Sequence, residues 1–389
     1  MKLVGAIGAS LVGAIGASRV GAIGASLVGA ICASRVGAIP LALVGAIGAS
    51  PVGASDFVKT ERTEIASGVH VFQTAPYGEV GLDGNAVVII SDAGVLVFDT
   101  NGTPAAASAV LAQIRALTDQ PVRYIVNSHW HWDHWYGTQV YKEAFPSAQV
   151  IAHAATREMM MGPALEFNRP GLEQQLPGYV RMLENKAAAD PAVQPRLETA
   201  RFFLDQKRSV RHVFPDLTFT TTLALSLGGR RIEVRHHDRA VTPGDAFLVL
   251  PDDGIVVTGD LLVNPIPFAL SVYPTGWLKS LEAIDALDAS VIIPGHGAPL
   301  RDESLLHATL EVFRVLLREG AAAKAKGLEV DAAKEAIMPA VEPAMKALTR
   351  NDPKLEEQFR IYVVDWYLHR VYDELSGPLT NAIAPIPKG

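Results

Sequence analysis

The sequence contains a single cysteine, Cys32, so the chain cannot form an intramolecular disulfide or a metal site built from several thiolates. It also has no run rich in Lys and Arg, and its formal net charge at pH 7 is −7. Both features argue against a nucleic-acid-binding surface and favour a small-molecule substrate as the partner. Hydrophobic residues make up 49% of the chain, enough for a sizeable core. The oligomeric state is left open.

Residues 1–55 consist mainly of octapeptide repeats of the form L/R-V-G-A-I-G-A-S. Units this short, without aromatic side chains, cannot pack like an ordinary repeat protein, so we expect a disordered or helical segment outside the fold. Arg19 and Arg35 interrupt the apolar run, so no stable membrane span of about 20 residues is present. Met1-Lys2 followed by small apolar residues is typical of a signal peptide, which would make the protein periplasmic or secreted. Otherwise we expect a cytoplasmic protein, and a start site placed too far upstream would also explain the repeats.

Residues 56–300 have the composition of a globular domain in which strand-like and helix-like segments alternate. Such alternation favours sheets with helices packed outside them. Helices are predicted at 104–117, around 141–143 and at 278–287. Short β-branched runs broken by Asp and Gly turns predict strands at 69–72, 86–90, 95–99, 122–127, 149–152, 217–219, 223–227, 232–235, 246–250, 255–258 and 291–293.

Two further regions are helical by sequence. Residues 155–210 predict a helical insertion near the mouth of a site, and the methionine run at 159–161 within it is typical of adaptable packing. Residues 301–389 predict a C-terminal helical extension that ends in a Pro-rich tail. This extension could cover the site or mediate dimerisation.

The segment 129–134 reads H-W-H-W-D-H and carries four potential metal ligands in six residues. Imidazole and carboxylate together suit zinc and its first-row neighbours, whereas calcium and magnesium sites use oxygen alone. An extended backbone would point His129, His131 and Asp133 to one side and His134 to the other. One metal could not easily use all four ligands, so the segment predicts a pair of metals. Paired metals a few ångströms apart are typical of hydrolytic enzymes.

Two later positions place another ligand directly after a short buried strand, where loops can converge. Asp260 follows the predicted strand 255–258, and His296 follows the predicted strand 291–293. A glycine precedes each of them and lets the backbone approach closely. Either signal is weak alone, but in combination with the segment 129–134 both indicate one binuclear site.

These segments together resemble the metallo-β-lactamase superfamily. The matching pieces, in the family's order, are F-D-T-N-G at 98–102, H-x-H-x-D-H at 129–134, T-P-G-D at 242–245, T-G-D at 258–260 and P-G-H-G at 294–297. The resemblance covers about residues 65–300 and implies an α/β (α+β) fold, the four-layer αββα sandwich of that family, with extra C-terminal helices. It is much less specific for substrate, because the family includes β-lactamases, lactonases, thioesterases, sulfatases and nucleases.

The resemblance also implies a ligand set for zinc, with one or two ions per chain. The first metal would be held by His129 and His131, the second by Asp133, His134 and His296, and Asp260 would bridge both. Asp99 matches an aspartate that orients a ligand from behind rather than binding the metal.

One position departs from the family pattern. A third histidine for the first metal usually stands directly before the T-x-G-D segment, and this chain has Val241 there. Valine cannot bind a metal, so we expect a weakened first site beside a better-formed second one. The bridging Asp260 could still complete the first site, or His236, His237 or Asp238 could replace the missing ligand from upstream. A protein that works with one metal is the third interpretation.

The function implied is that of a zinc-dependent hydrolase, in which a metal-bound hydroxide attacks an acyl substrate such as a β-lactam, lactone, ester or thioester. Asp133 would be the catalytic residue that orients the hydroxide. The alternative is a degenerate family member that binds metal or ligand without efficient catalysis, because of Val241.

Substrate-binding residues are not defined by the sequence. The aromatic side chains Trp130, Trp132, Trp135 and Tyr136 could line an apolar mouth or belong to the core. Arg239 and Lys279 could pair with a substrate carboxylate, although basic residues of this kind are commonly just solvated.

The weakened first site predicts about one tightly held metal per chain after purification in excess zinc, because Val241 removes a ligand. The substitution Val241→His should raise the metal content measured by elemental analysis. Two tightly held metals in the unchanged chain would contradict the prediction, and no gain in the variant would mean that the site is shaped for something else.

Overall fold

The structure is a computed structural model that describes residues 54–384. The octapeptide repeats up to residue 53, and with them the predicted signal peptide, lie outside the described residues. Within the described part, no helix is long and apolar enough to cross a membrane. The first described element is a short helix, α1 (Ala54–Phe57).

The strands form two sheets. The first is seven-stranded, in the order β1 (Thr60–Ala66), β2 (Val69–Thr74), β3 (Ala86–Ser91), β4 (Gly94–Phe98), β5 (Val122–Val126), β6 (Gln149–His153) and β7 (Leu217–Phe219). The second is five-stranded, in the order β12 (Val291–Pro294), β11 (Ile255–Gly259), β10 (Phe247–Leu250), β9 (Arg230–Arg235) and β8 (Thr222–Leu227).

All the predicted strands are present, and one strand was missed. Strand β1 has the sequence T-E-R-T-E-I-A, and most of its side chains are exposed. It pairs antiparallel with β2 at the edge of the seven-stranded sheet. A polar edge strand carries little apolar alternation, so the hydrophobic pattern could not reveal it.

Except for the turn α3, the helices of the described chain after α1 lie in or near the predicted regions. The helices after α1 are α2 (Pro104–Leu117), α3 (Trp132–Trp135), α4 (Thr138–Ala144), α5 (Ala154–Met160), α6 (Pro163–Pro170), α7 (Leu176–Ala187), α8 (Gln194–Ser209), α9 (Pro274–Asp285), α10 (Ser304–Ala325), α11 (Val330–Thr349), α12 (Pro353–Phe359) and α13 (Trp366–Ser376). Helix α2 has the predicted bounds because the Thr103 side chain accepts a hydrogen bond from the amide of Ala106 and Pro104 occupies the first turn.

The two sheets pack face to face through a layer of buried aliphatic side chains. Val71 and Val126 come from the first sheet and meet Leu248 and Val257 of the second. On the outer face of the first sheet, helices α2 and α4 cover another buried cluster, and on the outer face of the second sheet α9 and α10 do the same. The predicted αββα sandwich is therefore confirmed.

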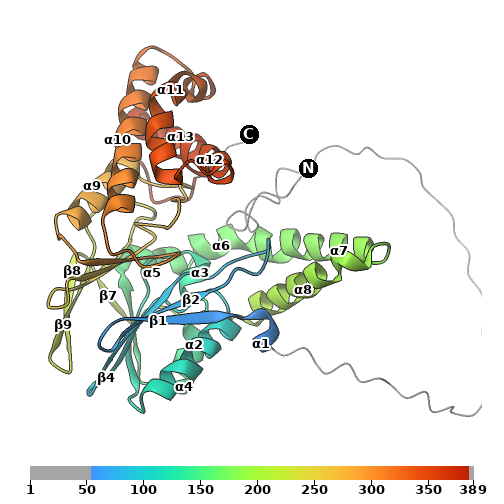
Figure 1. Ribbon diagram of the computed structural model, residues 1–389, viewed down its shortest axis with the longest axis vertical. Helices are drawn as coiled ribbons and strands as arrows, with labels where there is room; N and C mark the ends of the chain where they lie inside the picture. Colours follow the sequence, from blue (N-terminus) through green and yellow to red (C-terminus); the bar gives the residue numbers. More distant parts are fainter. Residues whose placement is uncertain (1–53, 385–389) are drawn as a thin grey trace, which may run out of the picture.

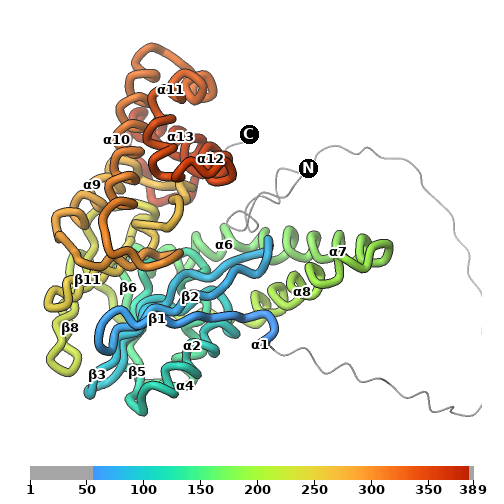
Figure 2. The backbone as a smooth tube through the Cα atoms, in the orientation of Figure 1, coloured from blue at the N-terminus to red at the C-terminus, as the bar shows by residue number. Residues whose placement is uncertain are grey.

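The helical region predicted at 155–210 consists of α5 to α8. Helices α7 and α8 lie side by side and project from the sandwich as an arm (Figures 1 and 2). Met159 and Met160 are buried in an aromatic cluster beneath this region, whereas Met161 is exposed. The methionine run therefore serves packing, as predicted.

Helices α10 to α13 form the C-terminal block beyond the second sheet (Figure 1). An aromatic cluster joins it to α9, in which the Phe313 ring lies 4.5 Å from the ring of Trp277 and 4.7 Å from that of Tyr367, centroid to centroid. All three side chains are fully buried. The block thus shares one continuous core with the outer face of the second sheet.

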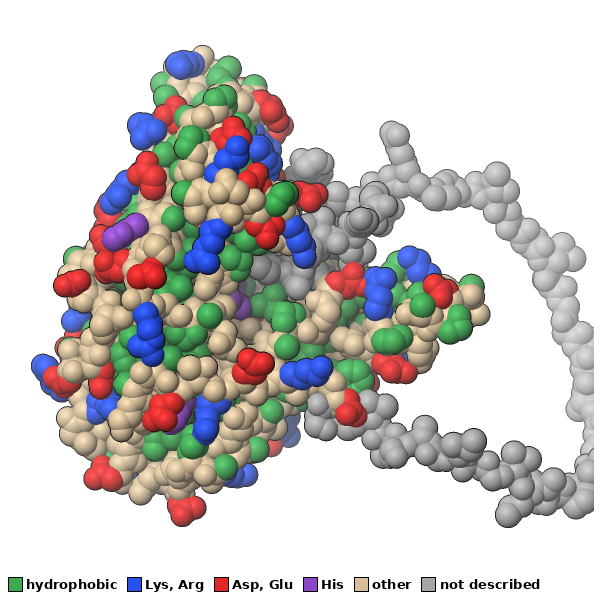
Figure 3. Space-filling view, in the orientation of Figure 1, with side chains coloured by type: hydrophobic (Ala, Val, Ile, Leu, Met, Phe, Trp, Pro, Cys, Tyr) green, Lys and Arg blue, Asp and Glu red, His purple; other side chains and the backbone are tan. Residues whose placement is uncertain are grey.

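The face of the molecule seen in Figure 3 carries acidic and basic side chains interspersed with one another. No broad field of one sign is visible on that face. An interspersed pattern of this kind produces no strong field of one sign over that face.

The contacts of Phe313 predict that Phe313→Ala lowers the free energy of unfolding by about 3–5 kcal/mol, because a large cavity is left beside the rings of Trp277 and Tyr367. Chemical denaturation followed by circular dichroism measures the change. Leu375→Ala is the control, since Leu375 is 51% exposed and should change stability little. Equal stability of both variants would show that the C-terminal block does not unfold with the sandwich.

Candidate metal centre

The predicted ligands come together at one edge of the sandwich, where strands of both sheets end. His129 and His131 follow β5 of the first sheet, whereas Asp260 follows β11 and His296 follows β12 of the second. Side chains that follow the ends of neighbouring strands converge at the same edge of a sheet. The two sheets therefore supply the two sides of the centre.

The extended conformation predicted for the segment 129–134 is wrong beyond its first residues. His131 has an extended backbone, with φ −62° and ψ 135°, but the helical turn α3 begins at the next residue. Asp133 therefore turns away from His129 and His131 and joins His134 instead. The helical turn splits the ligands between two groups.

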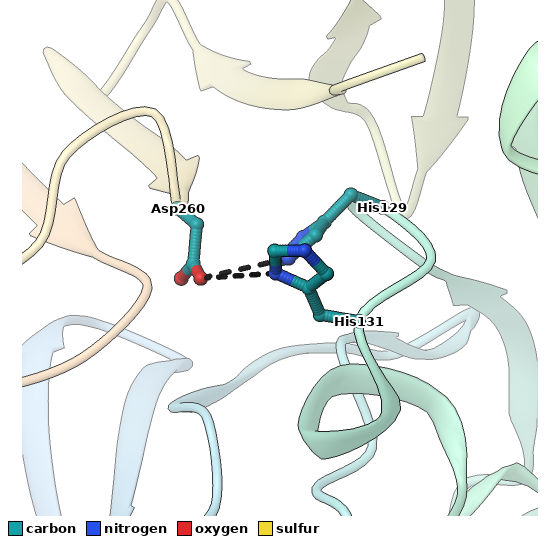
Figure 4. A group of neighbouring side chains, drawn as sticks. All are labelled: His129, His131 and Asp260. Atoms are coloured by element: carbon teal, nitrogen blue, oxygen red, sulfur yellow. Dashed lines mark ion pairs between the residues drawn. The ribbon is translucent and has the colours of Figure 1, made fainter. Parts of the chain in front are cut away.

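The first group contains His129, His131 and Asp260, drawn in Figure 4. The Asp260 Oδ2 atom lies 3.5 Å from His129 Nε2 and 3.9 Å from His131 Nδ1. Figure 4 shows both imidazoles directed at one side of the carboxylate.

The second group contains Asp133, His134 and His296. The Nε2 atoms of His134 and His296 are 3.2 Å apart, and the Asp133 Oδ2 atom lies 3.5 and 3.1 Å from them. The other oxygen of Asp260, Oδ1, lies 3.2 Å from His134 Nε2 and 3.5 Å from His296 Nε2. Asp260 therefore stands between the two groups and presents one oxygen to each.

The donor set fits metal ions. His129 Nε2 and Asp260 Oδ1 are buried, yet neither makes a hydrogen bond of good geometry within the described residues. Buried polar atoms are rarely left in this state unless another group satisfies them. Nitrogen and carboxylate oxygen are the donors that zinc and its neighbours use. Service as ligands remains a prediction for all six residues.

The charges of the centre support the same interpretation. Burial, together with the imidazoles of His134 and His131, lowers the pKa of His129 to about 4. Burial alone would raise the pKa of Asp260, but the imidazoles of His134, His296 and His129 outweigh this effect and hold it well below its usual value. A neutral His129 imidazole and an ionised Asp260 carboxylate are the forms that bind metals. Although burial opposes it, the Asp260 and Asp133 carboxylates raise the pKa of His134 and His296, so a bound cation would have to displace protons there.

Asp99 orients both groups from behind. Its Oδ2 atom lies 2.7 Å from His134 Nδ1 and accepts a hydrogen bond of 2.7 Å from the Ser128 hydroxyl, while the Ser128 amide donates to Oδ1. The Ser128 hydroxyl is in turn 2.8 Å from His129 Nδ1. One buried carboxylate thus fixes an imidazole in each group and leaves both Nε2 atoms facing the centre.

Two glycines let the backbone come close to the ligands. A side chain at Gly295 would place its Cβ 2.1 Å from Asp260 Oδ1, and one at Gly84 would lie 2.5 Å from the His134 ring. Any larger residue would displace these ligands. The role of Gly295 agrees with the sequence prediction, whereas Gly84 was not foreseen.

The loop that carries Gly84 also holds the His296 segment in place. The Asn85 side-chain amide donates to the carbonyls of Pro294 and Gly297, at 2.9 and 2.8 Å. Asn85 is more than 200 residues from these carbonyls, and its segment has only the turn-like composition of a loop. No local signal in the sequence indicates this contact.

Val241, at the position of the missing histidine, is a packing residue. Its side chain is 2% exposed and belongs to the cluster beneath the C-terminal helices. His236 stacks on His153 and faces the carbonyl of Asp245, while Asp238 pairs with Lys279 at 3.7 Å. Neither they nor His237 belong to a metal-binding group of the described residues, so none of them replaces the missing histidine in this conformation.

A cavity of about 630 Å³ opens onto the centre. Its walls include Trp130, Trp132, Phe167 and Phe268, whereas Trp135 lies fully buried behind it. Of the aromatic residues considered for the mouth, Trp130 and Trp132 therefore form part of the cavity wall, and Trp135 belongs to the core.

The basic residues of this cavity are not those considered from the sequence. Lys59 and Lys354 line it, whereas Arg239 and Lys279 do not. Arg239 lies over the Tyr273 ring and donates to the carbonyl of Leu379, so its role is structural. Lys354 comes from α12, so the C-terminal block contributes to the cavity.

Comparison with known proteins agrees with the fold. A family model described as the metallo-beta-lactamase superfamily matches residues 80–296. A linear primary-alkylsulfatase from Pseudomonas sp. is 24% identical over 238 residues, which cover 57% of this chain and 43% of the relative. The chain thus spans less than half the length of that curated relative.

The architecture is similar to that of one solved structure, and a second structure is less similar. The stereoselective inverting sec-alkylsulfatase Pisa1 from Pseudomonas sp. has 18% sequence identity and a TM-score of 0.57, with 82% of this chain and 51% of that chain covered. A metallo-beta-lactamase from Pontibacter korlensis has 19% identity and a TM-score of 0.47, with 66% of this chain and 99% of that chain covered.

The protein is an αββα sandwich with two adjoining His/Asp groups at one edge, which is the arrangement of a metallo-hydrolase fold. The chain belongs to the metallo-β-lactamase superfamily. The order of the matched segments and the positions of the two groups are those expected of a member.

The hydrogen bonds of Asp99 predict that Asp99→Asn lowers metal affinity by about 10–100-fold, because an amide cannot orient both imidazoles as the carboxylate does. Competition with a chromogenic chelator measures the affinity. Asp119→Asn is the matched control, since Asp119 is exposed on the surface. An unchanged affinity in the Asp99 variant would show that these hydrogen bonds do not position the ligands.

Proposed function

We propose that the protein is a zinc-dependent hydrolase that cleaves small esters with an apolar part, and that alkyl sulfate esters are the first substrates to consider. The observation that carries this proposal is the place of Asp260, which faces both His/Asp groups at the base of a cavity with aromatic walls. Paired metal groups beside an apolar cavity suit hydrolysis of an ester that has a charged and an apolar end.

The sequence likeness to a linear primary-alkylsulfatase supports the choice of sulfate esters. Acyl substrates such as lactones, thioesters and β-lactams belong to the same proposal in its broader form, because the family covers them. An alkyl sulfate has a compact anionic head and an apolar tail. The cavity offers both a site of metal ligands for the head and aromatic walls for the tail.

Zinc is proposed because the donors are imidazole nitrogens and carboxylate oxygens. When bound, zinc would supply Lewis acidity that activates water and polarises the ester. His129, His131 and Asp260 would hold one ion, and Asp133, His134 and His296 the other, with Asp260 shared between them. The second group has the fuller set of ligands of its own.

Asp133 is the residue proposed to orient the attacking water. Its carboxylate lines the cavity and is 12% exposed, so water can reach it. Although burial opposes ionisation, the imidazoles of His134 and His296 keep the pKa of Asp133 below its usual value. The carboxylate therefore stays ionised and can accept a hydrogen bond from the attacking water, which orients that water.

The aromatic walls would bind the apolar part of the substrate and exclude water from it. Trp130 and Phe167 form a T-shaped pair with centroids 6.0 Å apart, which makes a rigid wall beside His131. Phe268 lines the cavity from the loop after β11 and packs on Trp366 of the C-terminal block. A substrate tail between these rings would gain affinity from buried apolar area.

The proposal predicts that the zinc-loaded protein hydrolyses one class within a panel of linear alkyl sulfates, acyl lactones, thioesters and a chromogenic cephalosporin. Sulfate release and acid production measure turnover. A chelator should abolish turnover and added zinc should restore it, because both groups consist of metal ligands.

The rank order within the panel separates the alternatives. Turnover of alkyl sulfates above acyl esters supports the proposed substrate, whereas the reverse order assigns the protein to acyl substrates. Zinc binding without turnover of any class would contradict the proposal and support a degenerate member, for which Val241 is the structural reason.

A further inference from the structure

Lys207, on helix α8, is buried without a hydrogen-bond partner. The residue is 8% exposed, and its Nζ atom makes no hydrogen bond within the described residues. The ammonium lies 3.4 Å from the ring centroid of Trp132 and 4.3 Å from that of Tyr136. Aromatic faces attract a cation, but they leave its three N–H donors unpaired.

The nearest carboxylates are engaged elsewhere. Asp83 accepts hydrogen bonds from the Tyr77 hydroxyl at 2.6 Å and from the Gly102 amide at 2.5 Å. Asp133 faces His296 within the second metal group. No ion pair joins Lys207 to a carboxylate in the part of the chain that the structure describes, so the Asp133 and Asp83 charges act on it without a direct contact.

Burial lowers the pKa of Lys207 well below its usual value, against the opposing effect of the Asp133 and Asp83 charges. A buried cation without a direct ion pair is unfavourable, and a bound anion would relieve it. Lys207 would therefore be stabilised by an anionic ligand.

A second cavity, of about 240 Å³, lies beside this lysine. Its walls are mainly apolar and include Tyr136, Phe203 and Leu172. Asn168 also lines it, and its buried Nδ2 atom makes no hydrogen bond of good geometry within the described residues, although the side chain faces the Tyr136 hydroxyl. Two buried donors, Lys207 Nζ without a partner and Asn168 Nδ2 beside Tyr136, thus border one small apolar space.

We propose that this second cavity binds a small organic acid, whose carboxylate pairs with Lys207 and Asn168 and whose short apolar body lies between the aromatic walls. Lys207 is the buried cation of the cavity, and a monoanion would pair with it, while Arg169, Arg208 and Glu173 also line the cavity. The apolar walls favour an organic acid over an inorganic anion.

The site is distinct from the metal centre but adjoins it. Trp132 and Asn168 line both cavities, and Trp132 stands between His131 and Asp133 in the chain. Lys207 belongs to neither metal group. The inference does not depend on hydrolysis, so the absence of turnover would leave it standing.

Calorimetric titration of the zinc-loaded protein with hexanoate tests the proposal, with 1-hexanol as the uncharged probe of the same chain length. Hexanoate should bind, and 1-hexanol should bind at least tenfold more weakly. Lys207→Met should weaken hexanoate binding at least tenfold while keeping the zinc content. Lys186→Met is the matched control, because Lys186 is exposed on α7 and lies outside the cavity.

A second variant guards against misfolding of the first. Leu172→Trp fills the cavity and leaves Lys207 in place, so it should also abolish hexanoate binding. Absence of binding to the unchanged protein, or equal binding of hexanoate and 1-hexanol, would overturn the proposal. Binding that persists in either variant would place the acid at the metal centre and would overturn it as well.

Discussion

The centre depends on one buried carboxylate shared between two sets of imidazoles. Asp260 presents Oδ2 to His129 and His131 and Oδ1 to His134 and His296, all within 3.9 Å. Burial of a carboxylate is unfavourable unless positive charge or hydrogen bonds compensate it. Here the surrounding imidazoles, and the metals that they are suited to hold, provide that compensation. The two groups cannot be moved apart without leaving this carboxylate unpaired.

The packing of the two sheets against each other holds this carboxylate in place. Asp260 follows a strand of one sheet, while the histidines of segment 129–134 follow a strand of the other, so close packing between the sheets sets their separation. Asp99 fixes an imidazole of each group, and Gly295 permits the close approach of the His296 loop. The C-terminal block closes the outer face of the second sheet and contributes to the substrate cavity.

Several features of this arrangement were predictable from local signals. The strands, the helix 104–117 and the helical region 155–210 follow from periodicity and turn residues, because these patterns act within a few residues. The polar strand β1 and the helical turn α3 were not predictable in this way. An edge strand needs no apolar face. The turn at segment 129–134 depends on the tertiary contacts that hold Asp133 and His134 in the second group.

The sequence by itself determined the fold class, the family and the candidate ligands, because ligand type and order along the chain identify them. The resemblance implied how the ligands divide between two groups, but only the tertiary structure decided their distances and orientations, since these depend on how two sheets and a helical turn meet. The same holds for Val241, which became a core residue under the C-terminal helices. Lys207 illustrates the limit most clearly, because a lysine on a helix is ordinarily solvated, and only packing against Trp132 buries its charge.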